Sequence, residues 1–298
     1  MKLAILSASA VFVLAVTALQ SGARSNDPAP PSFDRVRRID ASTPRPASRS
    51  IRLMTWNIDR GTELERVGSA MEHNPADLYL LQEVDWNTER AHERDVTADL
   101  ARELHFNAVF GIEFEELSQE RGHPAYTGQA TLTSLPIRAS RILRFERQSG
   151  FWKPRSWVPS GMPLMQRRIG SRIALVSELS FAGQLLVVYN AHLESRSAGM
   201  IQSEQIDEIL SDARRYPSDT AIILGGDLNT KYLAAIFLHK LERAGFTSAL
   251  GEHIQRTHRI AMALDWIYAK GPVHLENGEV RRDVKGSDHY PIYATLRR

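Results

Sequence analysis

The chain has 298 residues, enough for one large domain with a substantial hydrophobic core. It contains no cysteine, which excludes disulfide bonds and a lipid-modified N-terminal cysteine. The formal net charge is +2, but residues 1–50 hold seven basic and three acidic residues, leaving 30 basic and 32 acidic residues for residues 51–298. The positive total therefore says little about the partners of the domain.

An apolar N-terminal stretch is followed by a polar, proline-rich segment. Residues 3–19 are apolar after Lys2, and Ser21-Gly22-Ala23 supplies small residues for cleavage, which predicts a signal peptide over residues 1–23 and export to the periplasm or beyond the cell. A membrane anchor is the alternative, but the stretch is slightly short for a span and contains Ser and Thr. Residues 24–50, rich in Pro, Ser, Ala and Arg, predict a disordered linker.

Residues 51–298 alternate between apolar runs and amphipathic segments, without an internal repeat. Strands are predicted at residues 51–58, 77–82, 106–112, 129–133, 173–181, 184–191, 222–226, 264–269 and 292–296. Helices are predicted at residues 62–73, 95–104, 198–215 and 231–244. Hairpin-like strand pairs with helices between other strands indicate an α/β fold with two sheet layers and helices outside.

The central predicted strand ends in Gly225-Gly226-Asp227-Leu228-Asn229. The glycines let the backbone turn tightly, and Asp227 and Asn229 point to the same side of an extended chain. A carboxylate beside an amide suits a phosphate-hydrolysing site with a hard metal ion. The alternative is an ordinary strand followed by an Asx turn.

Polar side chains stand at the ends of five further apolar runs. These are Asn57, Glu83, His192, Asp265 and the pair Asp288-His289. Each residue alone is typical of a cap, a turn or a surface histidine, but all six places repeat one pattern. Carboxylate and amide oxygens without cysteine favour Mg²⁺ or Mn²⁺ over zinc.

The motifs together resemble those of the endonuclease/exonuclease/phosphatase superfamily. They are Trp56-Asn57, Gln82-Glu83, Asn190-Ala191-His192-Leu193, Gly226-Asp227-Leu228-Asn229, Leu264-Asp265-Trp266 and Ser287-Asp288-His289. Their order matches, and they extend over the domain at residues 51–298. The superfamily contains pancreatic-type deoxyribonucleases, abasic-site endonucleases, neutral sphingomyelinases and inositol polyphosphate 5-phosphatases. The resemblance implies a deoxyribonuclease I-like four-layer α/β sandwich, with two packed mixed β-sheets flanked by helices and the site at one end.

The resemblance also implies a metal site. Glu83 would be the principal ligand of Mg²⁺ or Mn²⁺, helped by Asn57. Asp288 would be a further ligand of the metal or of a water molecule.

The remaining motif residues would carry out the chemistry. Asp227 would orient or deprotonate the attacking water, and Asn229 would hold a phosphate oxygen. His289 would contact the phosphate or act as acid or base, oriented by Asp265. His192 matches a histidine of the deoxyribonuclease, sphingomyelinase and 5-phosphatase branches that abasic-site endonucleases lack.

Two further site residues follow from the resemblance. Tyr126 precedes Gly128-Gln129-Ala130-Thr131-Leu132, which resembles the family's central strand with Gln where Asn is frequent. Arg172 matches an arginine that often precedes an Ala-Leu strand, and we expect it to bind substrate. The alternatives are a packing tyrosine and a surface arginine. In deoxyribonucleases a nearby glutamate supports the equivalent of His192, and Gly128 falls at its place, which leaves that support open.

Residues 138–172 form a basic segment on an otherwise acidic domain, with nine basic residues and a single acid, Glu146. They are predicted to form a strand pair and loop beside the site. Phe151, Trp152 and Trp157 are interleaved, and arginines with aromatics suit a nucleic-acid backbone with stacked bases. They also suit a lipid interface, or an ordinary solvated strand pair.

The favoured function is an exported, metal-dependent endonuclease or phosphodiesterase that cleaves P–O bonds by in-line attack of an activated water. A sphingomyelinase-like phospholipase C or an inositol phosphate phosphatase is the alternative, and an inactive binding module is the third class, because the fold does not choose the substrate. Nucleic acid is the favoured phosphoester substrate, before a lipid head group or an inositol phosphate. No protein partner is evident, and we expect a monomer.

Overall fold

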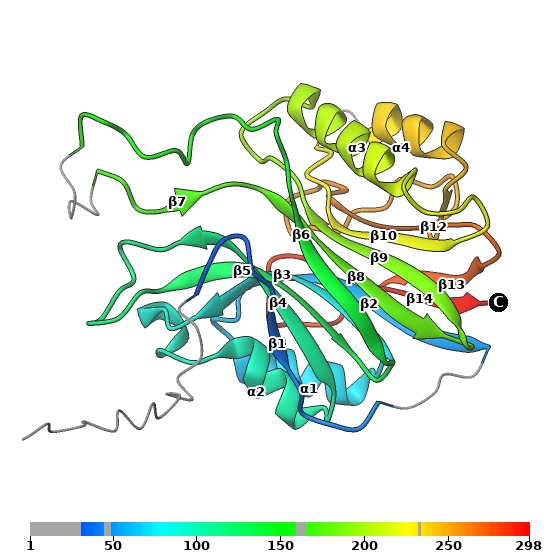
Figure 1. Cartoon of the computed structure of the whole chain (residues 1–298), viewed down its shortest axis with the longest axis horizontal. Coiled ribbons are helices and arrows are strands. Elements are labelled where there is room, and N and C mark those ends of the chain that lie inside the picture. The colour runs from blue at the N-terminus through cyan, green and yellow to red at the C-terminus, as the bar shows by residue number, and fades with distance from the viewer. Residues whose placement is uncertain (1–30, 45–48, 159–164, 232–233) are drawn as a thin grey trace, which may run out of the picture. The chain divides into compact units, whose positions relative to one another are not determined.

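The computed structural model describes residues 31–44, 49–158, 165–231 and 234–298 (Figure 1). The predicted signal peptide lies outside these ranges, as does part of the predicted linker. None of the helices within them is long and apolar enough to cross a membrane.

The first sheet contains eight strands in the part of the chain that the structure describes. Seven follow the order β1-β4-β5-β3-β2-β14-β13, and β7 pairs with β4. Within this sheet β2 and β3 run parallel, while the other neighbours run antiparallel. The strands are β1 (Arg37–Ile39), β2 (Ser50–Arg60), β3 (Leu78–Trp86), β4 (Asn107–Glu115), β5 (Tyr126–Thr133), β7 (Ile169–Gly170), β13 (His274–Val280) and β14 (Ile292–Arg297).

The second sheet has six strands over the same ranges, in the order β11-β12-β10-β9-β8-β6. Here β9 and β10 run parallel and the other neighbours antiparallel, so this sheet is also mixed. Its strands are β6 (Ile137–Arg144), β8 (Ile173–Phe181), β9 (Gln184–His192), β10 (Ala221–Asp227), β11 (Thr247–Ser248) and β12 (Asp265–Lys270).

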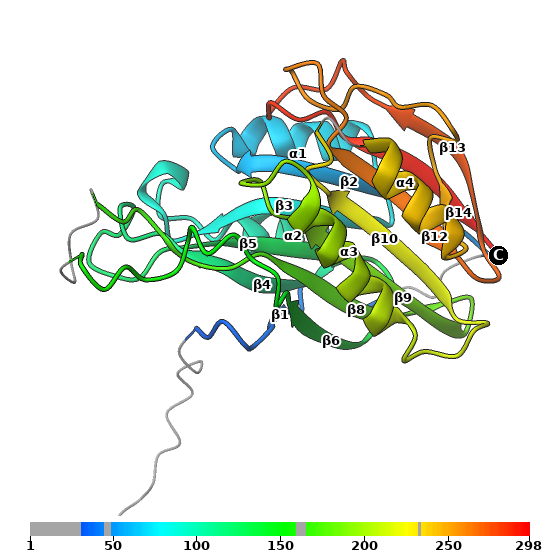
Figure 2. The same ribbon diagram turned by 90° about the horizontal axis from the view of Figure 1, so that it is seen from above.

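Helices cover the outer faces of both sheets. Helices α1 (Leu64–His73) and α2 (Val96–Glu103) pack on the first sheet, and a short 3₁₀ helix, η1 (Glu89–Ala91), precedes α2. Helices α3 (Met200–Ala213) and α4 (Ala234–Arg243) lie together on the second sheet (Figures 1 and 2). A third apolar cluster fills the space between the sheets. The four-layer sandwich with two packed mixed sheets, expected from the motifs, is thereby confirmed.

Buried amide side chains join the two sheets. Gln82 Nε2 donates to Asn190 Oδ1 at 2.7 Å, and Asn190 Nδ2 donates to the carbonyl oxygen of Ala130 at 2.9 Å. Gln129 Nε2 donates to the carbonyl oxygen of Ile173 at 2.9 Å. Because an unpaired buried amide costs about 1–3 kcal/mol, these bonds favour one relative placement of the sheets. That placement brings the ends of β2, β3, β9 and β10 together.

The basic segment does not form the predicted strand pair. Its first part belongs to β6, which pairs with β8 in the second sheet, and its last part contains β7, which pairs with β4 in the first sheet. The segment therefore connects two sheets instead of closing a hairpin on itself. Residues 159–164, in its middle, lie outside the described ranges.

The predicted linker is not disordered throughout. Arg37–Ile39 forms β1, which pairs antiparallel with Ala108–Phe110 of β4. This pairing satisfies an edge of the first sheet with residues far away in the sequence, and local composition does not reveal such a contact. Strand β13 was also not anticipated.

Candidate active site

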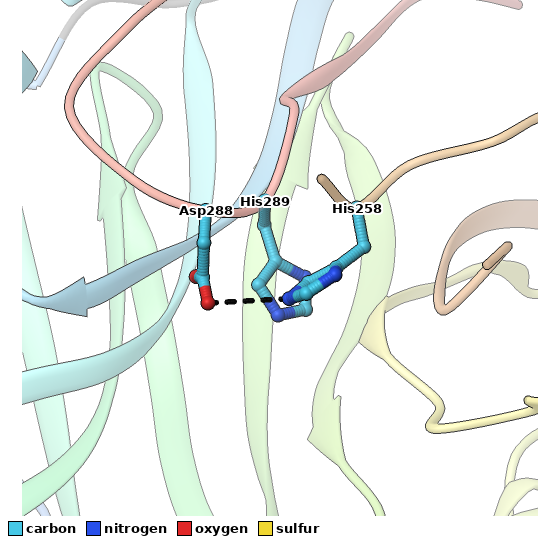
Figure 3. A group of neighbouring side chains, drawn as sticks. All are labelled: His258, Asp288 and His289. Carbon is cyan, nitrogen blue, oxygen red and sulfur yellow. Dashed lines mark hydrogen bonds and ion pairs between the residues drawn. The ribbon is translucent and has the colours of Figure 1, made fainter. Parts of the chain in front are cut away.

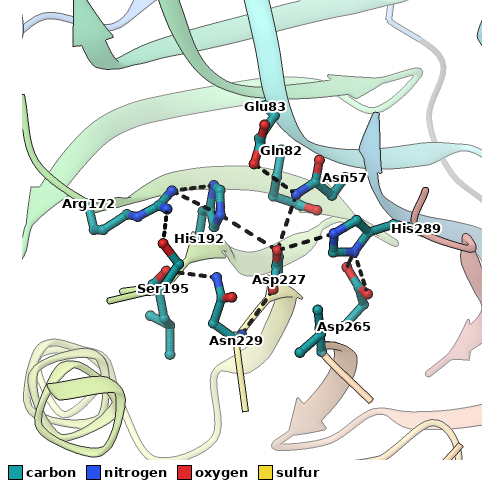
Figure 4. A network of polar contacts seen from close by, with 12 residues as sticks. Asn57, Gln82, Glu83, Arg172, His192, Ser195, Asp227, Asn229, Asp265 and His289 are labelled. Atoms are coloured by element: carbon teal, nitrogen blue, oxygen red, sulfur yellow. Dashed lines mark hydrogen bonds and ion pairs between the residues drawn. The ribbon is translucent and has the colours of Figure 1, made fainter. Parts of the chain in front are cut away.

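The topology brings the predicted motif residues to one end of both sheets. Asp227 ends β10 and lies opposite His192, the last residue of the parallel strand β9. Strand β12 runs antiparallel to β10, so its first residue, Asp265, also lies opposite Asp227. In the first sheet, β14 runs antiparallel to β2, which places His289, just before β14, near Asn57 in the last part of β2. Figure 4 shows these side chains converging.

The backbone of the turn at Gly226-Asp227-Leu228-Asn229 determines where the Asp227 side chain lies. A Cβ on Gly226, which has φ +142°, would lie 1.9 Å from the carbonyl oxygen of Ala191, so only glycine lets β10 approach β9 this closely. Asn229 has φ +48°, and its backbone N–H donates to Asp227 Oδ1 at 2.9 Å. Asn229 Nδ2 donates to the carbonyl oxygen of Leu193 at 3.0 Å, which uses one of its two amide hydrogens. The Asx turn, which was the alternative interpretation of this segment, is therefore part of the site.

The other carboxylate oxygen of Asp227 lies at the centre of the site. Asn57 Nδ2 donates to Asp227 Oδ2 at 3.1 Å. His192 Nε2 lies 3.6 Å from the same oxygen and His289 Nε2 lies 3.8 Å from it. A group placed beside this oxygen is thus within reach of two imidazoles at once.

His289 is held by a buried carboxylate and by its own backbone. Its Nδ1 lies 2.9 Å from Asp265 Oδ2 and 3.1 Å from Oδ1. The carbonyl oxygen of His289 accepts from Trp56 Nε1 at 3.0 Å, and its N–H donates to Ser287 Oγ at 3.1 Å. Burial alone would lower the pKa of His289, but the Asp265 carboxylate and two further aspartates outweigh burial and raise the pKa to about 10. These carboxylates therefore favour the protonated form of His289.

Glu113 is the carboxylate that supports His192, and none of the sequence motifs predicted it. Glu113 Oε2 lies 3.2 Å from His192 Nδ1, and Oε1 accepts from Arg172 Nη1 at 2.6 Å. Burial opposes its ionisation, but His192 and Arg172 lower the pKa of Glu113. Gly128 could not carry the support, because a Cβ there would lie 2.1 Å from the carbonyl oxygen of Gly111.

Arg172 lies beside His192 and is not a surface residue. Only 5% of its side chain is exposed. Its Nη1 lies 2.9 Å from both ring nitrogens of His192, and its Nη2 donates to Ser195 Oγ at 3.0 Å. The side-chain amide of Gln148 bonds the backbone N–H and carbonyl of Arg172 at 3.0 and 2.9 Å. Arg172 is thus fixed at both ends beside the imidazole.

Tyr126 stays outside this group. Its ring packs against Trp86, with ring centroids 5.5 Å apart, within the core between the first sheet and its helices. Among the interactions of residues 31–44, 49–158, 165–231 and 234–298, none joins the Tyr126 hydroxyl to a motif residue. Tyr126 therefore has the surroundings of a packing tyrosine, which was the alternative to a site residue.

Glu83 reaches the site from a β-bulge. The register of β3 against β5 shifts between Leu81 and Val84, and Glu83 adopts φ +49°. Bulges re-aim side chains next to active sites. Glu83 Oε2 lies 3.0 Å from Arg60 Nη2, and Oε1 accepts from Asn57 Nδ2 at 3.4 Å. Burial opposes ionisation, but Arg60, His192 and further arginines hold the pKa of Glu83 well below its usual range.

A third histidine–carboxylate pair lies at the edge of the site (Figure 3). His258 Nε2 lies 3.2 Å from Asp288 Oδ2, and this contact lowers the pKa of Asp288. The rings of His258 and His289 meet edge to face, with centroids 4.5 Å apart. The neighbouring Thr257 Oγ1 accepts from the backbone N–H of Asp265 at 3.1 Å. No motif pointed to His258, which lies in an irregular stretch before β12.

The donor chemistry fits a hard divalent cation. Glu83 and Asp288 both stay ionised, because their pKa values are lowered, and Asn57 adds an amide oxygen. Among the residues that the structure describes, two other groups have ligand atoms within 4.8 Å of one another: His258, Asp288 and His289, and Asp227, Asp265 and His289. Neither of these groups includes Glu83. His289 belongs to both, but its Nδ1 is already bound to Asp265.

A family profile matches most of the chain. The profile of the Endonuclease/Exonuclease/phosphatase family matches residues 54–289. No curated protein matches the sequence significantly.

Solved structures share the fold at low sequence identity. An endonuclease/exonuclease/phosphatase from Beutenbergia cavernae is 16% identical, with TM-score 0.61 over 84% of this chain and 72% of that one. The human Nocturnin catalytic domain with bound sulfate is also 16% identical, with TM-score 0.63 over 88% and 97%. TDP2 from C. elegans is 19% identical, with TM-score 0.54 over 84% and 75%.

Proposed function

Because the chain belongs to the endonuclease/exonuclease/phosphatase family, whose members are generally divalent-metal-dependent phosphoester hydrolases, we propose that it is an exported endonuclease or phosphodiesterase. It would cleave P–O bonds by in-line attack of an activated water. The observation that carries this proposal is the position of Asp227, whose Oδ2 lies between two imidazoles that are each backed by a buried carboxylate. That arrangement provides a proton acceptor beside two groups able to bind phosphate oxygens.

In the proposed reaction, Asp227 orients the water and accepts its proton. His289, a cation held by Asp265, stabilises the negative charge that develops on the phosphate. His192, oriented by Glu113 and Arg172, contacts a second phosphate oxygen or the leaving group. The remaining amide hydrogen of Asn229 points to the same phosphate in this proposal. Asp265, which pairs with His289, and Glu113, which pairs with both His192 and Arg172, keep these charges in place before substrate arrives.

The metal ion would be held by Glu83, Asn57 and Asp288, and it would neutralise charge on the scissile phosphate when bound. We predict that activity is lost in excess EDTA and restored by Mg²⁺ or Mn²⁺. Replacing Glu83 by glutamine should raise the metal concentration needed for half-maximal rate, because it removes an ionised ligand. Hydrolysis that continues undiminished in excess chelator would contradict the metal dependence.

The substrate is tested by one panel. The protein lacking residues 1–23, which keeps β1 intact, is assayed with Mg²⁺ against plasmid DNA, RNA, sphingomyelin and an inositol phosphate. We expect nucleic acid to be cleaved fastest. A lipid substrate is the second candidate, because Trp157 and Met165 are 64% and 42% exposed in the basic segment, as in membrane-contacting loops. Faster hydrolysis of sphingomyelin than of DNA and RNA would establish that alternative.

Export is proposed from the N-terminal pattern alone. We predict that the mature protein begins near residue 24 outside the cytoplasm, which N-terminal sequencing of the native protein measures. An intact Met1 on protein recovered from the cytoplasm would contradict export while leaving the proposed chemistry untouched.

A further inference from the structure

A cavity of about 970 Å³ opens beside the candidate active site. Glu83 and Arg172 belong to both the site and the cavity wall. The rest of the described wall comes from Arg60 at the end of β2, Arg90 in η1, the loop between β4 and β5, the basic segment, and the loop after β9. Its size is typical of a small-molecule pocket and sufficient for a nucleotide unit.

The wall carries more positive charge than its own acids neutralise. It contains seven arginines and two glutamates. Four of these arginines have carboxylate partners: Arg60 pairs with Glu83, Arg90 and Arg168 pair with Glu116, and Arg172 pairs with Glu113.

The other three arginines are Arg155, Arg167 and Arg196. Within the described part of the chain, none of them has a carboxylate within ion-pair distance. Uncompensated guanidinium groups around a concave, solvent-filled space attract anions strongly, because the low-dielectric walls focus their field.

Aromatic rings lie against two of these three guanidiniums, those of Arg155 and Arg196, and against that of Arg168. The guanidinium of Arg196 lies 4.3 Å from the ring centroid of Phe151, and that of Arg155 lies 5.6 Å from the same ring. Arg168 lies 5.2 Å from the Phe114 centroid and 5.3 Å from that of Trp152. Stacking on a ring uses the face of a guanidinium and leaves its N–H edge free. That edge is the part of arginine that binds phosphate oxygens in pairs.

The arginines of the basic segment have different surroundings and do not form one continuous surface. Arg141 donates to Asp212 at 2.5 Å, and Arg144 donates to the carbonyl oxygen of Phe33 at 2.5 Å. These two side chains are engaged within the fold. Arg155, Arg167 and Arg168 from the same segment line the cavity instead, and Arg155 and Arg167 have no carboxylate partner among the described residues.

We propose that the cavity binds a second phosphate group of the substrate, one that is not cleaved, next to the scissile phosphate. This inference rests on the proposed function and narrows it. The preferred substrate is an oligonucleotide or nucleic-acid end that presents at least two phosphates, rather than an isolated phosphodiester. A lipid head group with a single phosphodiester fills only the catalytic position.

The test replaces Arg155, Arg167 and Arg196 together by glutamine. Two ligands are compared: the dinucleoside monophosphate TpT, with one phosphodiester, and pTpTp, which adds terminal phosphates. For the unmodified protein we expect at least tenfold tighter binding of pTpTp than of TpT, measured calorimetrically in EDTA so that no turnover is needed. The triple variant should lose this preference through weaker pTpTp binding, while hydrolysis of TpT and bis-p-nitrophenyl phosphate stays within about twofold.

A matched control removes the same charge elsewhere. Arg35, Arg214 and Arg243 are exposed and lie outside this cavity, so replacing all three by glutamine should leave the preference for pTpTp unchanged. An equal loss in both triple variants would overturn the inference, since it would reflect net charge alone. Equal binding of TpT and pTpTp by the unmodified protein would also overturn it.

Two outcomes distinguish this inference from a membrane-binding role of the arginines and from the proposed hydrolase function. If the cavity triple variant detaches from anionic vesicles but keeps its preference for pTpTp, the arginines serve a membrane surface and the inference is wrong. If pTpTp binding shows the expected preference while no phosphoester is hydrolysed, the cavity assignment holds and the proposed function fails.

Discussion

Replacing Asp227 by asparagine should reduce the rate of phosphodiester hydrolysis by about 10²–10⁴-fold, the usual contribution of a positioned general base. The asparagine keeps the shape of the side chain and can still accept the backbone N–H of Asn229 through its oxygen. It removes the negative charge and the proton acceptor that face His192 and His289. The loss should therefore fall on kcat, with the fold preserved.

The measurement is the initial rate with bis-p-nitrophenyl phosphate at saturating Mg²⁺, alongside the thermal unfolding midpoint. Asp207, which pairs with Lys240 on the surface, provides the control: Asp207→Asn removes the same charge and should leave the rate unchanged. A rate for Asp227→Asn within tenfold of the parent would remove Asp227 from the mechanism.

The second large effect concerns His289. Replacing it by alanine should reduce the rate by about 10²–10³-fold, the cost of losing one preorganised electrostatic donor. The variant also leaves the buried Asp265 carboxylate without its cation, and an unpaired buried charge destabilises the fold. The double variant His289→Ala, Asp265→Asn should recover part of the lost stability without recovering activity. Such non-additivity would show that the two residues act as one unit.

The control for this prediction is His274, which pairs with Glu276 on the exposed strand β13. His274→Ala should change neither rate nor stability. Full activity of His289→Ala in a folded protein would contradict the assigned role. Equal stability of the single and double variants would contradict only the coupling to Asp265.

The motif residues could be placed from sequence because each lies beside an apolar run that forms a strand. The strand directions of the sandwich bring such positions to the same edge of the sheets. Strand register, for example, places Asp227 opposite both His192 and Asp265. The short central segment Gly225-Gly226-Asp227-Leu228-Asn229 contains both the backbone requirement and the chemistry. Features of this kind depend on residues that are neighbours in the sequence, so they could be predicted from it.

Glu113 was missed for a physical reason. It stands in the apolar run Phe110–Phe114, where the register of β4 against β5 shifts between Ile112 and Phe114. The bulge adds a residue, breaks the alternation of the strand and turns a fully buried carboxylate toward His192. A charged residue inside an apolar strand was the available signal, but its partner, Arg172, lies 59 residues away.

The basic segment and β1 show the same limit. The sequence predicted that residues 138–172 form one basic strand pair and loop. In the structure an ion pair with Asp212 engages Arg141, and contacts with Phe33 and Ser171 engage Arg144. These partners come from distant parts of the chain. Composition likewise predicted disorder where Arg37–Ile39 pairs with β4. Non-local pairing overrode local composition in both places.

The central claim is that the protein hydrolyses a phosphoester by attack of water on phosphorus. The most direct measurement is hydrolysis of bis-p-nitrophenyl phosphate in ¹⁸O-labelled water with Mg²⁺, followed by mass spectrometry of both products. We expect one labelled oxygen in p-nitrophenyl phosphate and none in p-nitrophenol, with the reaction slowed at least a hundredfold in Asp227→Asn. Label in p-nitrophenol, or no Mg²⁺-dependent hydrolysis of this compound, DNA, RNA, sphingomyelin or an inositol phosphate, would contradict it.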